Sequence, residues 1–471
     1  MLYDRRMDDL ERSLHRAAGL IADYRRNGAD ARVSPVSTRE AVASHLDPTL
    51  PAGPTPIDTV IDELVASAAP GLMGSAGPRY FGFVVGGSLD AALVADLLTS
   101  GWDQNAFNGT LSPASLAFED VAGSWLKQLL GLPASASVGY VTGAGGANTV
   151  GLAAGRSHAL AAYGWDADRD GLFGAPRLRV VASVERHATV DRSLRLLGLG
   201  DGSIDAVPTT ANGAMDADAL AARLAAGPAG PTIVCAQAGN VNTGACDDLR
   251  AIAAAAREHG AWLHVDGAFG LWAAASAGTA ALVDGVELAD SWGCDGHKWL
   301  NVPYDSGYAF CAHPEVHVGA MAYVASYLSG QVEGRTFGGG DFTLESSRRA
   351  RGFATWAALR SLGRAGVADL VDRCCSLARR FAERLDALDG FEVANDVVLN
   401  QVLVRVGDEA LTNDVERRVQ DDGTCWLGAT TRRGERLLRI SVSNWSTTAA
   451  DVDASVEAIR SAREAALAER A

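Results

Sequence analysis

The stretch 290-DSWGCDGHKWLNVPYDSG-307 contains Lys298, one of only two lysines in a chain of 471 residues. Arginine supplies nearly all the other basic groups, yet a guanidinium stays protonated, whereas a lysine amine can lose its proton and form a Schiff base with an aldehyde. A short β-like run precedes Lys298, which predicts a loop at the carboxyl end of a strand, where open α/β sheets bind their ligands. The other lysine, Lys127, fits an amphipathic helix and is interpreted as a solvated residue. Lys298 is therefore the candidate nucleophile.

Around this stretch, apolar strand-like runs alternate with helical patterns from about residue 75 onward. Such alternation predicts an α/β fold with a mostly parallel sheet covered on both faces. After a long helical pattern, the C-terminal region reads strand, strand, helix, strand, strand, helix, which predicts a small α+β domain. We expect an N-terminal helical arm over residues 1–70, a large domain over 71–365 and a small domain over 366–471.

The arm has two helical patterns joined by the Pro-rich passage SHLDPTLPAGPTPID, and neither pattern has a core of its own. We expect the arm to pack on a partner subunit in a homodimer.

Composition narrows the function classes. The net charge of −16, without any basic run, argues against nucleic acid or an anionic membrane as a partner. No secretory signal, membrane-spanning segment or metal-ligand spacing is predicted. Seven scattered cysteines without a C-x-x-C pair are typical of reduced thiols, so a cytoplasmic location is expected.

Three further segments bring polar groups to the predicted carboxyl edge of the sheet. In AWLHVDGAFG, Asp266 ends an apolar strand, where it either caps a turn or pairs with a protonated pyridine nitrogen. VTGAGGANTVG is a glycine-rich turn that enters a helix and offers backbone N–H groups to a phosphate. His187 opens the helix after another strand, as a ring stack, an acid–base group or a simple cap. Together with Lys298, these are the functions that a pyridoxal-phosphate site requires.

The same segments resemble the group II pyridoxal-phosphate-dependent decarboxylases, which include the aromatic-L-amino-acid and glutamate decarboxylases. DSWGCDGHKWLNVPYDSG is similar to their lysine signature, WLHVDGAFG to their aspartate segment and HATVDRSLRLLGLG to their histidine segment. RYFGFVVGG and SPASLAFEDVAGSWLKQLLGLP resemble their N-terminal substrate-side strand and following helix, so the likeness spans roughly residues 55–460. It implies the aspartate-aminotransferase fold, fold type I, with a seven-stranded sheet and with active sites shared across a dimer.

The resemblance also implies a role for each matching residue. Lys298 would form the Schiff base, Asp266 would pair with the pyridine nitrogen, and His187 and Ala268 would flank the cofactor ring. The phosphate would be held by Gly143, Ala144 and Gly145, helped by Ser291 and His297, and the substrate would meet Phe83, Val84 and Arg439. The predicted activity is decarboxylation of an L-amino acid.

Two departures from the family keep other reactions open. Asn240 and Val241 stand where the family carries two threonines. Gly339 stands near the place where typical members carry the loop tyrosine that protonates the substrate α-carbon, and no tyrosine occurs in GRTFGGGDFTLESS. A carbon–carbon lyase, an aldehyde synthase and an aminotransferase therefore remain alternatives, and a catalytically silent paralogue is disfavoured by the intact lysine and aspartate. Tyr323, Tyr327 and His187 are the alternative proton donors, and Phe83, Trp102 and Tyr304 are either pocket-lining or ordinary core residues.

Overall fold

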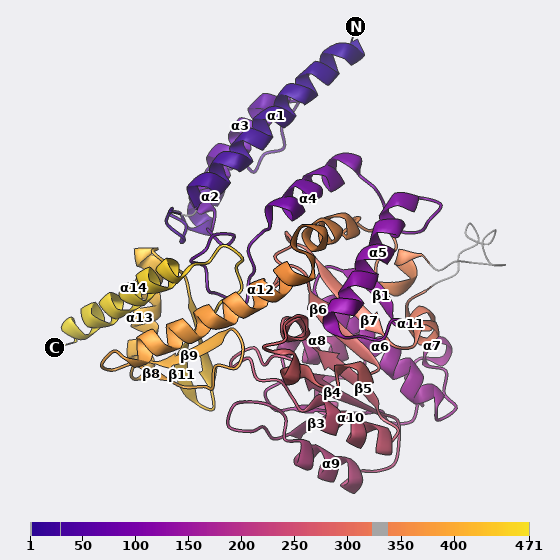
Figure 1. Ribbon diagram of the computed structural model, residues 1–471. Helices are drawn as coiled ribbons and strands as arrows, with labels where there is room; N and C mark the ends of the chain where they lie inside the picture. Colours follow the sequence, from indigo (N-terminus) through magenta and orange to yellow (C-terminus); the bar gives the residue numbers. More distant parts are fainter. Residues whose placement is uncertain (1, 29, 323–337, 471) are drawn as a thin grey trace.

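The computed structural model describes residues 2–28, 30–322 and 338–470, and Figure 1 shows how they are arranged. A helical arm projects from a large α/β domain, and the C-terminal domain lies beside it. The fold predicted from the sequence, a mostly parallel seven-stranded sheet with a smaller α+β unit, is confirmed.

The large domain is built on one sheet of seven short strands. The strand order is β1-β7-β6-β5-β4-β2-β3, and all neighbours are parallel except those of β7, which runs antiparallel to β1 and β6. The strands are β1 (Ser137–Val141), β2 (Arg179–Ser183), β3 (Ile204–Val207), β4 (Thr232–Gln237), β5 (Trp262–Asp266), β6 (Ser291–Asp295) and β7 (Gly307–Cys311). The four strands β4 to β7 are buried throughout, as expected for strands covered on both faces.

Alternate residues of each strand pack into different apolar clusters. Ile233 and Cys235 of β4 join one cluster with α6 and α8, whereas Val234 belongs to the main core. The helices of this domain are α4 (Asp90–Trp102), α5 (Pro113–Leu130), α6 (Ala144–Ala161), α7 (Ala167–Asp170), α8 (Ala188–Leu196), α9 (Ala217–Ala226), α10 (Leu249–Glu258) and α11 (Pro314–Met321).

The small domain follows the long helix α12 (Gly352–Asp386), which contains a non-helical Gly363 close to the predicted boundary at residue 365. Its antiparallel sheet has the order β10-β11-β9-β8. The elements are β8 (Glu392–Val393), β9 (Gln401–Arg405), α13 (Glu409–Asp422), β10 (Gly428–Arg432), β11 (Glu435–Ser441) and α14 (Ala449–Ala468).

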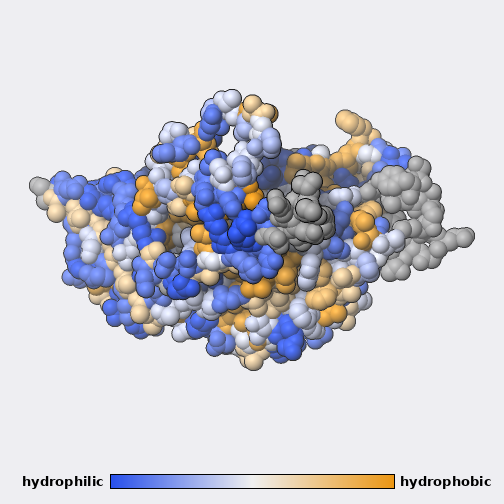
Figure 2. Space-filling view, turned by 90° about the horizontal axis from the view of Figure 1, so that it is seen from above, coloured by the Kyte–Doolittle hydropathy of each residue, from blue (hydrophilic) through white to orange (hydrophobic). Residues whose placement is uncertain are grey.

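The arm consists of α1 (Leu2–Gly28), α2 (Arg39–Ser44) and α3 (Ile57–Ala68). Arg16 of α1 pairs with Asp58 and Asp62 of α3, so the two long helices lie side by side. No residue of α3 is buried. Large apolar side chains remain exposed on the arm: Leu10, Leu14, Ile57, Val60 and Leu64. Figure 2, which looks down on this side of the molecule, shows apolar patches between hydrophilic ones.

One predicted element is wrong. The segment RYFGFVVGG is not a regular strand: Tyr80 forms an isolated bridge to Trp426, and Phe83 and Val84 adopt left-handed φ angles of 53° and 57°. The segment instead runs against the loop of Lys298, where Gly86 leaves so little space that an added Cβ would lie 1.8 Å from the Lys298 carbonyl oxygen.

Close approach also explains two glycines inside α6. An added Cβ at Gly155 would lie 2.7 Å from Cδ1 of the buried Trp262, and one at Gly151 would lie 2.6 Å from Nδ1 of His264. Glycine weakens a helix interior by about 1 kcal/mol relative to alanine. In α6 it allows the helix to pack directly on the side chains of β5.

We therefore expect Gly155→Ala to destabilise the protein, opposite to the usual effect of this substitution in a helix. The extra methyl group should displace Trp262 and cost about 1–3 kcal/mol of unfolding free energy, as overpacking does elsewhere. Gly19→Ala in α1, where the added Cβ meets nothing within 4 Å, is the matched control and should be neutral or stabilising. Urea denaturation of both variants measures the difference, and a stabilising Gly155→Ala would contradict this account of the packing.

Candidate active site

Lys298 lies in the loop after β6, at the carboxyl edge of the sheet. Its Nζ is 3.0 Å from Oδ2 of Asp295, the last residue of β6, and the two side chains are 19% and 3% exposed. The Asp295 Oδ1 accepts a 2.5 Å hydrogen bond from the backbone N–H of Ala144, the first residue of α6. The loop is fixed by Asn301, whose side chain accepts from Gly87 and donates to the Ser443 carbonyl. Lys298 is thus held between the glycine-rich turn and the small domain.

Asp266 ends β5 next to β6 and is only 5% exposed. Its Oδ2 accepts a 3.0 Å hydrogen bond from the Asn148 amide, and its Oδ1 is 3.3 Å from the backbone nitrogen of Ala268. No ion pair joins this carboxylate to an arginine, lysine or histidine of the described chain. A cationic partner stabilises a buried carboxylate. The protonated ring of pyridoxal phosphate is such a partner, so the residues present fit this cofactor.

His187 caps the N-terminus of α8, where its Nδ1 accepts from the Thr189 backbone N–H and contacts the Thr189 hydroxyl at 2.8 Å. Burial lowers the pKa of the imidazole; the charge of Asp266 opposes this shift, whereas Lys298 and Arg439 reinforce it. These electrostatic contacts bring His187 into the same site as the predicted lysine and aspartate. Because Nδ1 is engaged, Nε2 is the ring nitrogen that forms no hydrogen bond within the described residues.

The predicted phosphate cradle is the start of α6. An added Cβ at Gly143 would lie 2.9 Å from Cε1 of His297, so glycine is required for the two loops to meet. His297 stacks on Tyr304 with ring centroids 4.3 Å apart, and burial lowers its pKa. Gly145 lies beside Thr189 of the His187 segment. These residues converge as the sequence predicted.

Ser291 does not fit its predicted role. It is the first residue of β6, whereas the cradle lies beyond the last one, and four residues of strand span roughly 13 Å. Its hydroxyl is fully buried and contacts Trp262 Nε1 and His264 Nδ1, each at 2.9 Å. We therefore remove Ser291 from the phosphate contacts.

The three predicted substrate residues differ in accessibility. Phe83 is 63% exposed and contacts Trp426 at a centroid distance of 5.3 Å, whereas Val84 is 1% exposed and belongs to the main core. Val84 is therefore a packing residue, contrary to the prediction. Arg439 of β11 forms no ion pair within the described chain, its Nη1 lies 3.5 Å from the Val241 carbonyl, and burial lowers its pKa. An arginine in this state can bind an incoming carboxylate.

Two other residues that the sequence singled out lie elsewhere. Lys127 is not simply solvated, because its Nζ donates to the carbonyls of Ala134 and Ala136, both at 2.7 Å, and burial lowers its pKa. Trp102 packs edge-on against Phe353 at 5.2 Å, in a separate aromatic cluster.

Gly339, at the position of the family's loop tyrosine, has no room for any side chain. An added Cβ would lie 1.6 Å from Nη2 of Arg348. Arg348 forms a two-point ion pair with Glu119 at 2.6 and 2.7 Å, and both side chains are almost fully buried. A tyrosine there would displace this pair. Tyr323 and Tyr327 lie outside the described residues.

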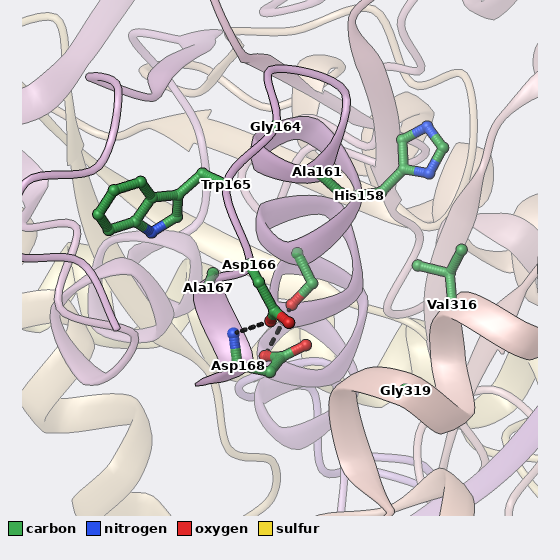
Figure 3. Close-up of a pocket in the computed structure, with 10 residues that line it drawn as sticks. His158, Ala161, Gly164, Trp165, Asp166, Ala167, Asp168, Val316 and Gly319 are labelled. Atoms are coloured by element: carbon green, nitrogen blue, oxygen red, sulfur yellow. Dashed lines mark hydrogen bonds between the residues drawn. The ribbon is translucent and has the colours of Figure 1, made fainter. Parts of the chain in front are cut away.

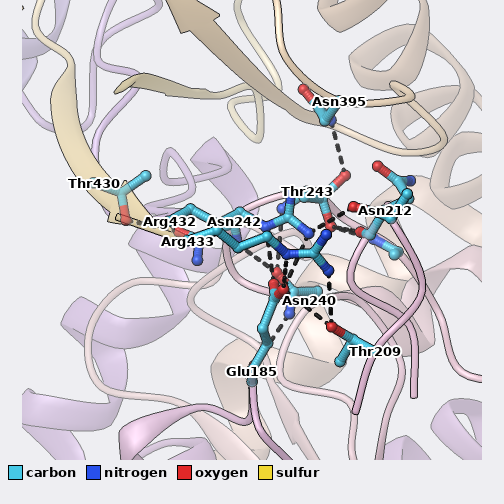
Figure 4. A network of polar contacts seen from close by, with 12 residues as sticks. Glu185, Thr209, Asn212, Asn240, Asn242, Thr243, Asn395, Thr430, Arg432 and Arg433 are labelled. Atoms are coloured by element: carbon cyan, nitrogen blue, oxygen red, sulfur yellow. Dashed lines mark hydrogen bonds and ion pairs between the residues drawn. The ribbon is translucent and has the colours of Figure 1, made fainter. Parts of the chain in front are cut away.

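Sequence reasoning missed a polar network that joins the two domains (Figure 4). Arg432 and Arg433, at the tip of the β10–β11 hairpin, both bind the Glu185 carboxylate, two residues before His187. Asn240, the departure from the family pattern, donates its amide to the Glu185 carbonyl at 3.1 Å. The network therefore holds the small domain against the loop that carries His187. Its only sequence signal was the unusual Asn240.

The two arginines differ in burial, which allows a matched test of this network. Arg432 is 8% exposed and Arg433 is 48% exposed, against 14% for Glu185. Removing the buried partner leaves a carboxylate that has little water, so we expect Arg432→Gln to cost about 2–3 kcal/mol in urea denaturation. Arg433→Gln should cost less than about 1 kcal/mol because solvent screens that pair. Equal losses of unfolding free energy in the two variants would contradict the proposed effect of burial.

The pH dependence of the unfolding free energy gives a second check on the Glu185–Arg432 pair. Burial alone would raise the pKa of Glu185, but the hydrogen bonds and charge of Arg432, with Thr209 and Arg433, outweigh it and leave the pKa below the usual 4.5. A depressed carboxylate pKa stabilises the fold above pH 4.5 and loses this contribution as the pH falls further. The difference in unfolding free energy between wild type and Arg432→Gln should therefore become smaller as the pH falls below 4.5.

A surface pocket at the other end of α6 contains none of the predicted residues (Figure 3). It is lined by His158, Trp165, Asp166, Asp168 and Val316, among others. Within the described ranges, no group of three or more histidine, cysteine or acidic side chains is placed to hold a metal ion. None of the described helices combines the length and apolarity needed to cross a membrane.

Comparison with known proteins identifies the family of this chain. A model of the pyridoxal-dependent decarboxylase conserved domain matches residues 40–406. Tryptophan decarboxylase 1 of Oryza sativa subsp. japonica is 29% identical over 93% of this chain and 90% of the relative. 4-Hydroxyphenylacetaldehyde synthase of Rhodiola rosea is 28% identical over 79% of this chain and 78% of the relative. The crystal structure of Oryza sativa TDC with PLP and tryptamine matches with a TM-score of 0.89 and 27% identity, covering 97% of this chain and 98% of that chain. The chain therefore belongs to the pyridoxal-dependent decarboxylase family, with fold type I, and is a carboxy-lyase that uses pyridoxal phosphate.

Proposed function

We propose that this decarboxylase removes the α-carboxylate of an aromatic L-amino acid as CO₂, at the site built around Lys298. The observation that carries the site assignment is Asp266, a buried carboxylate with no cationic partner in the described chain, close to the candidate lysine. Bound pyridoxal phosphate supplies an aldehyde that condenses with amines and a protonated ring that withdraws electrons from the substrate α-carbon.

The chain's own residues divide the remaining work. Lys298 is the amine that holds the cofactor, and Asp266 keeps the ring nitrogen protonated. His187 covers the ring, with Ala268 on the opposite side, and the start of α6 with His297 receives the phosphate. Arg439, half-buried and without a carboxylate partner in the described chain, is suited to orient the substrate carboxylate.

Aromatic side chains support the substrate class. Tyr80 stacks on Trp426 at 5.0 Å, and Phe83 contacts the same indole. Burial raises the pKa of Tyr304 to about 12, with smaller contributions from Asp295 and Tyr80, so Tyr304 lies near this group. Such a surface offers stacking partners to an aromatic ring. The names of the tryptophan decarboxylase and 4-hydroxyphenylacetaldehyde synthase relatives point to the same class.

A second outcome is favoured by one observation, the lack of space for a tyrosine at Gly339. Without that proton donor, the aldehyde-forming reaction becomes the alternative. It consumes one O₂ and one water per amino acid and releases aldehyde, CO₂, ammonia and hydrogen peroxide.

One experiment separates these outcomes. The holoenzyme is incubated with tryptophan, tyrosine, phenylalanine, glutamate and 2,4-diaminobutyrate, while CO₂, amine, aldehyde, ammonia and O₂ uptake are followed. We expect CO₂ and amine in equal amounts from an aromatic substrate, and peptide mapping after borohydride reduction should find the cofactor on Lys298. Aldehyde with matching O₂ uptake would establish the alternative reaction. An adduct on Lys127, or turnover of only the acidic or basic substrates, would contradict the proposal.

We also propose a homodimer in which the arm covers a partner subunit, because exposed apolar stripes on paired helices need a partner surface. A cytoplasmic location stays a prediction from the sequence.

We expect Leu14→Glu with Leu64→Glu to yield a folded monomer, because these side chains are 61% and 60% exposed in the single chain. Phe173→Glu, at a site that is 99% exposed outside the arm, is the control and should leave the mass unchanged. Light scattering coupled to size exclusion measures the mass. A dimer that survives the arm substitutions would exclude the arm as the main interface.

A further inference from the structure

A series of buried, hydrogen-bonded polar side chains lies between α6 and the sheet and ends on Asp266. Trp262 Nε1 donates to the Ser291 hydroxyl at 2.9 Å, and the same hydroxyl contacts His264 Nδ1 at 2.9 Å. His264 Nε2 lies 3.1 Å from Asn148 Oδ1, and Asn148 Nδ2 donates to Asp266 Oδ2 at 3.0 Å. Ser291, His264 and Asn148 are fully buried.

The residues at the two ends, Trp262 and Asp266, decide which group donates and which accepts in every hydrogen bond of this series. An indole can only donate, so Ser291 accepts from Trp262 and turns its own proton toward His264 Nδ1. An ionised carboxylate can only accept, so the Asn148 NH₂ faces Asp266 and its oxygen faces His264. The imidazole must then carry its proton on Nε2. A neutral histidine has one proton, and burial lowers the pKa of His264 to about 4, which keeps it neutral.

If every donor and acceptor is exchanged, the hydrogen bonds are less well satisfied. A protonated Asp266 would donate to Asn148, and the reversed chain would oblige Ser291 to donate elsewhere. The acceptor that lies near it is the Gly151 carbonyl, at 3.5 Å, the outer limit of a hydrogen bond. The geometry therefore matches a chain in which the Asp266 carboxylate accepts from the Asn148 amide.

Two glycines make room for this chain. An added Cβ at Gly151 of α6 would lie 2.6 Å from His264 Nδ1, and one at Gly293 of β6 would lie 2.5 Å from Asn148 Oδ1. Apolar side chains would be less costly to bury here, because buried polar atoms cost free energy unless all of them form hydrogen bonds. The glycines indicate that the space is shaped around the imidazole and the amide.

We propose that Trp262, Ser291, His264 and Asn148 form a one-directional hydrogen-bond relay that orients Asp266 toward the cofactor's ring nitrogen. The four are positioning residues, and this inference rests on the role of Asp266 under the proposed function. Asn148 also donates to the Thr189 hydroxyl at 3.1 Å, which in turn contacts His187, so the relay sets the ring-covering histidine as well. At its far end, Trp262 packs on His158, 5.1 Å away, which is labelled in the wall of the pocket in Figure 3.

The test is a mutant cycle read out by the affinity of the apo-protein for pyridoxal phosphate and by urea denaturation of the apo-protein. His264→Leu and Asn148→Leu break the relay, and His264→Gln keeps a donor toward Asn148 and an acceptor toward Ser291. Cys235→Ala, on the neighbouring strand at the level of His264, is the buried control. We expect both leucine variants to bind the cofactor about ten- to a hundredfold more weakly, and His264→Gln to recover most of the loss.

The cycle separates positioning from mere packing. In an Asp266→Asn background, His264→Leu should cause no further loss of cofactor affinity, because the relay acts through that carboxylate. An undiminished loss in that background, or unchanged affinity in both leucine variants, would overturn the relay. Unchanged affinity in Asp266→Asn itself would overturn the proposed role of Asp266 and the relay with it.

If the leucine variants fail to fold, the wild-type protein still decides the question. Nitrogen-15 NMR of histidine-labelled apo-protein should find the His264 proton on Nε2 from pH 6 to 8. A proton on Nδ1 would contradict the relay.

Discussion

A carboxylate at the end of a buried strand is stable only if it gains hydrogen bonds and a cation in place of water. Asp266 has the hydrogen bonds, from Asn148 and Ala268, and the described chain provides no cation in contact with it. Much of the site follows from that requirement. α6 approaches β5 closely enough to deliver Asn148 because Gly151 and Gly155 lack side chains. The same helix begins at Ala144, so under the proposed function a single element would serve both the ring end and the phosphate end of the cofactor.

The anionic cofactor meets a second carboxylate at that helix start. Asp295 accepts from the Ala144 N–H and lies 3.0 Å from Lys298, so it competes for the positive end of the helix and for the lysine charge. His297 lies 3.5 Å from Asp295, and burial lowers the pKa of its imidazole. In the single chain, Asp295 therefore links Lys298 to the start of α6.

The sequence predicted the sheet, Lys298, Asp266 and His187 because each depends on a local pattern: a buried strand, a polar residue at its end, and a glycine or cap that starts a helix. It failed for Ser291, where distance along the chain was taken as distance in space, and for Val84, whose substrate role came from the family resemblance. Ser291 is seven residues from Lys298, but an extended strand separates them. The relay residues Asn148 and His264 lie in an apolar helix and an apolar strand, and only the packing of α6 on β5 brings them together. A polar residue inside an apolar helix or strand was the one signal available.

The choice of reaction depends on which group delivers a proton to the substrate α-carbon. Gly339 excludes a donor at the family's usual position because the Glu119–Arg348 pair fills the space. His187 is proposed to cover the cofactor ring, yet burial lowers its pKa and its Nδ1 is engaged by Thr189. Only its Nε2 edge can deliver a proton, and a neutral imidazole is a weak acid. A slow proton transfer gives dioxygen time to compete, so the geometry around Gly339 and His187 links the choice between amine and aldehyde to the access of O₂.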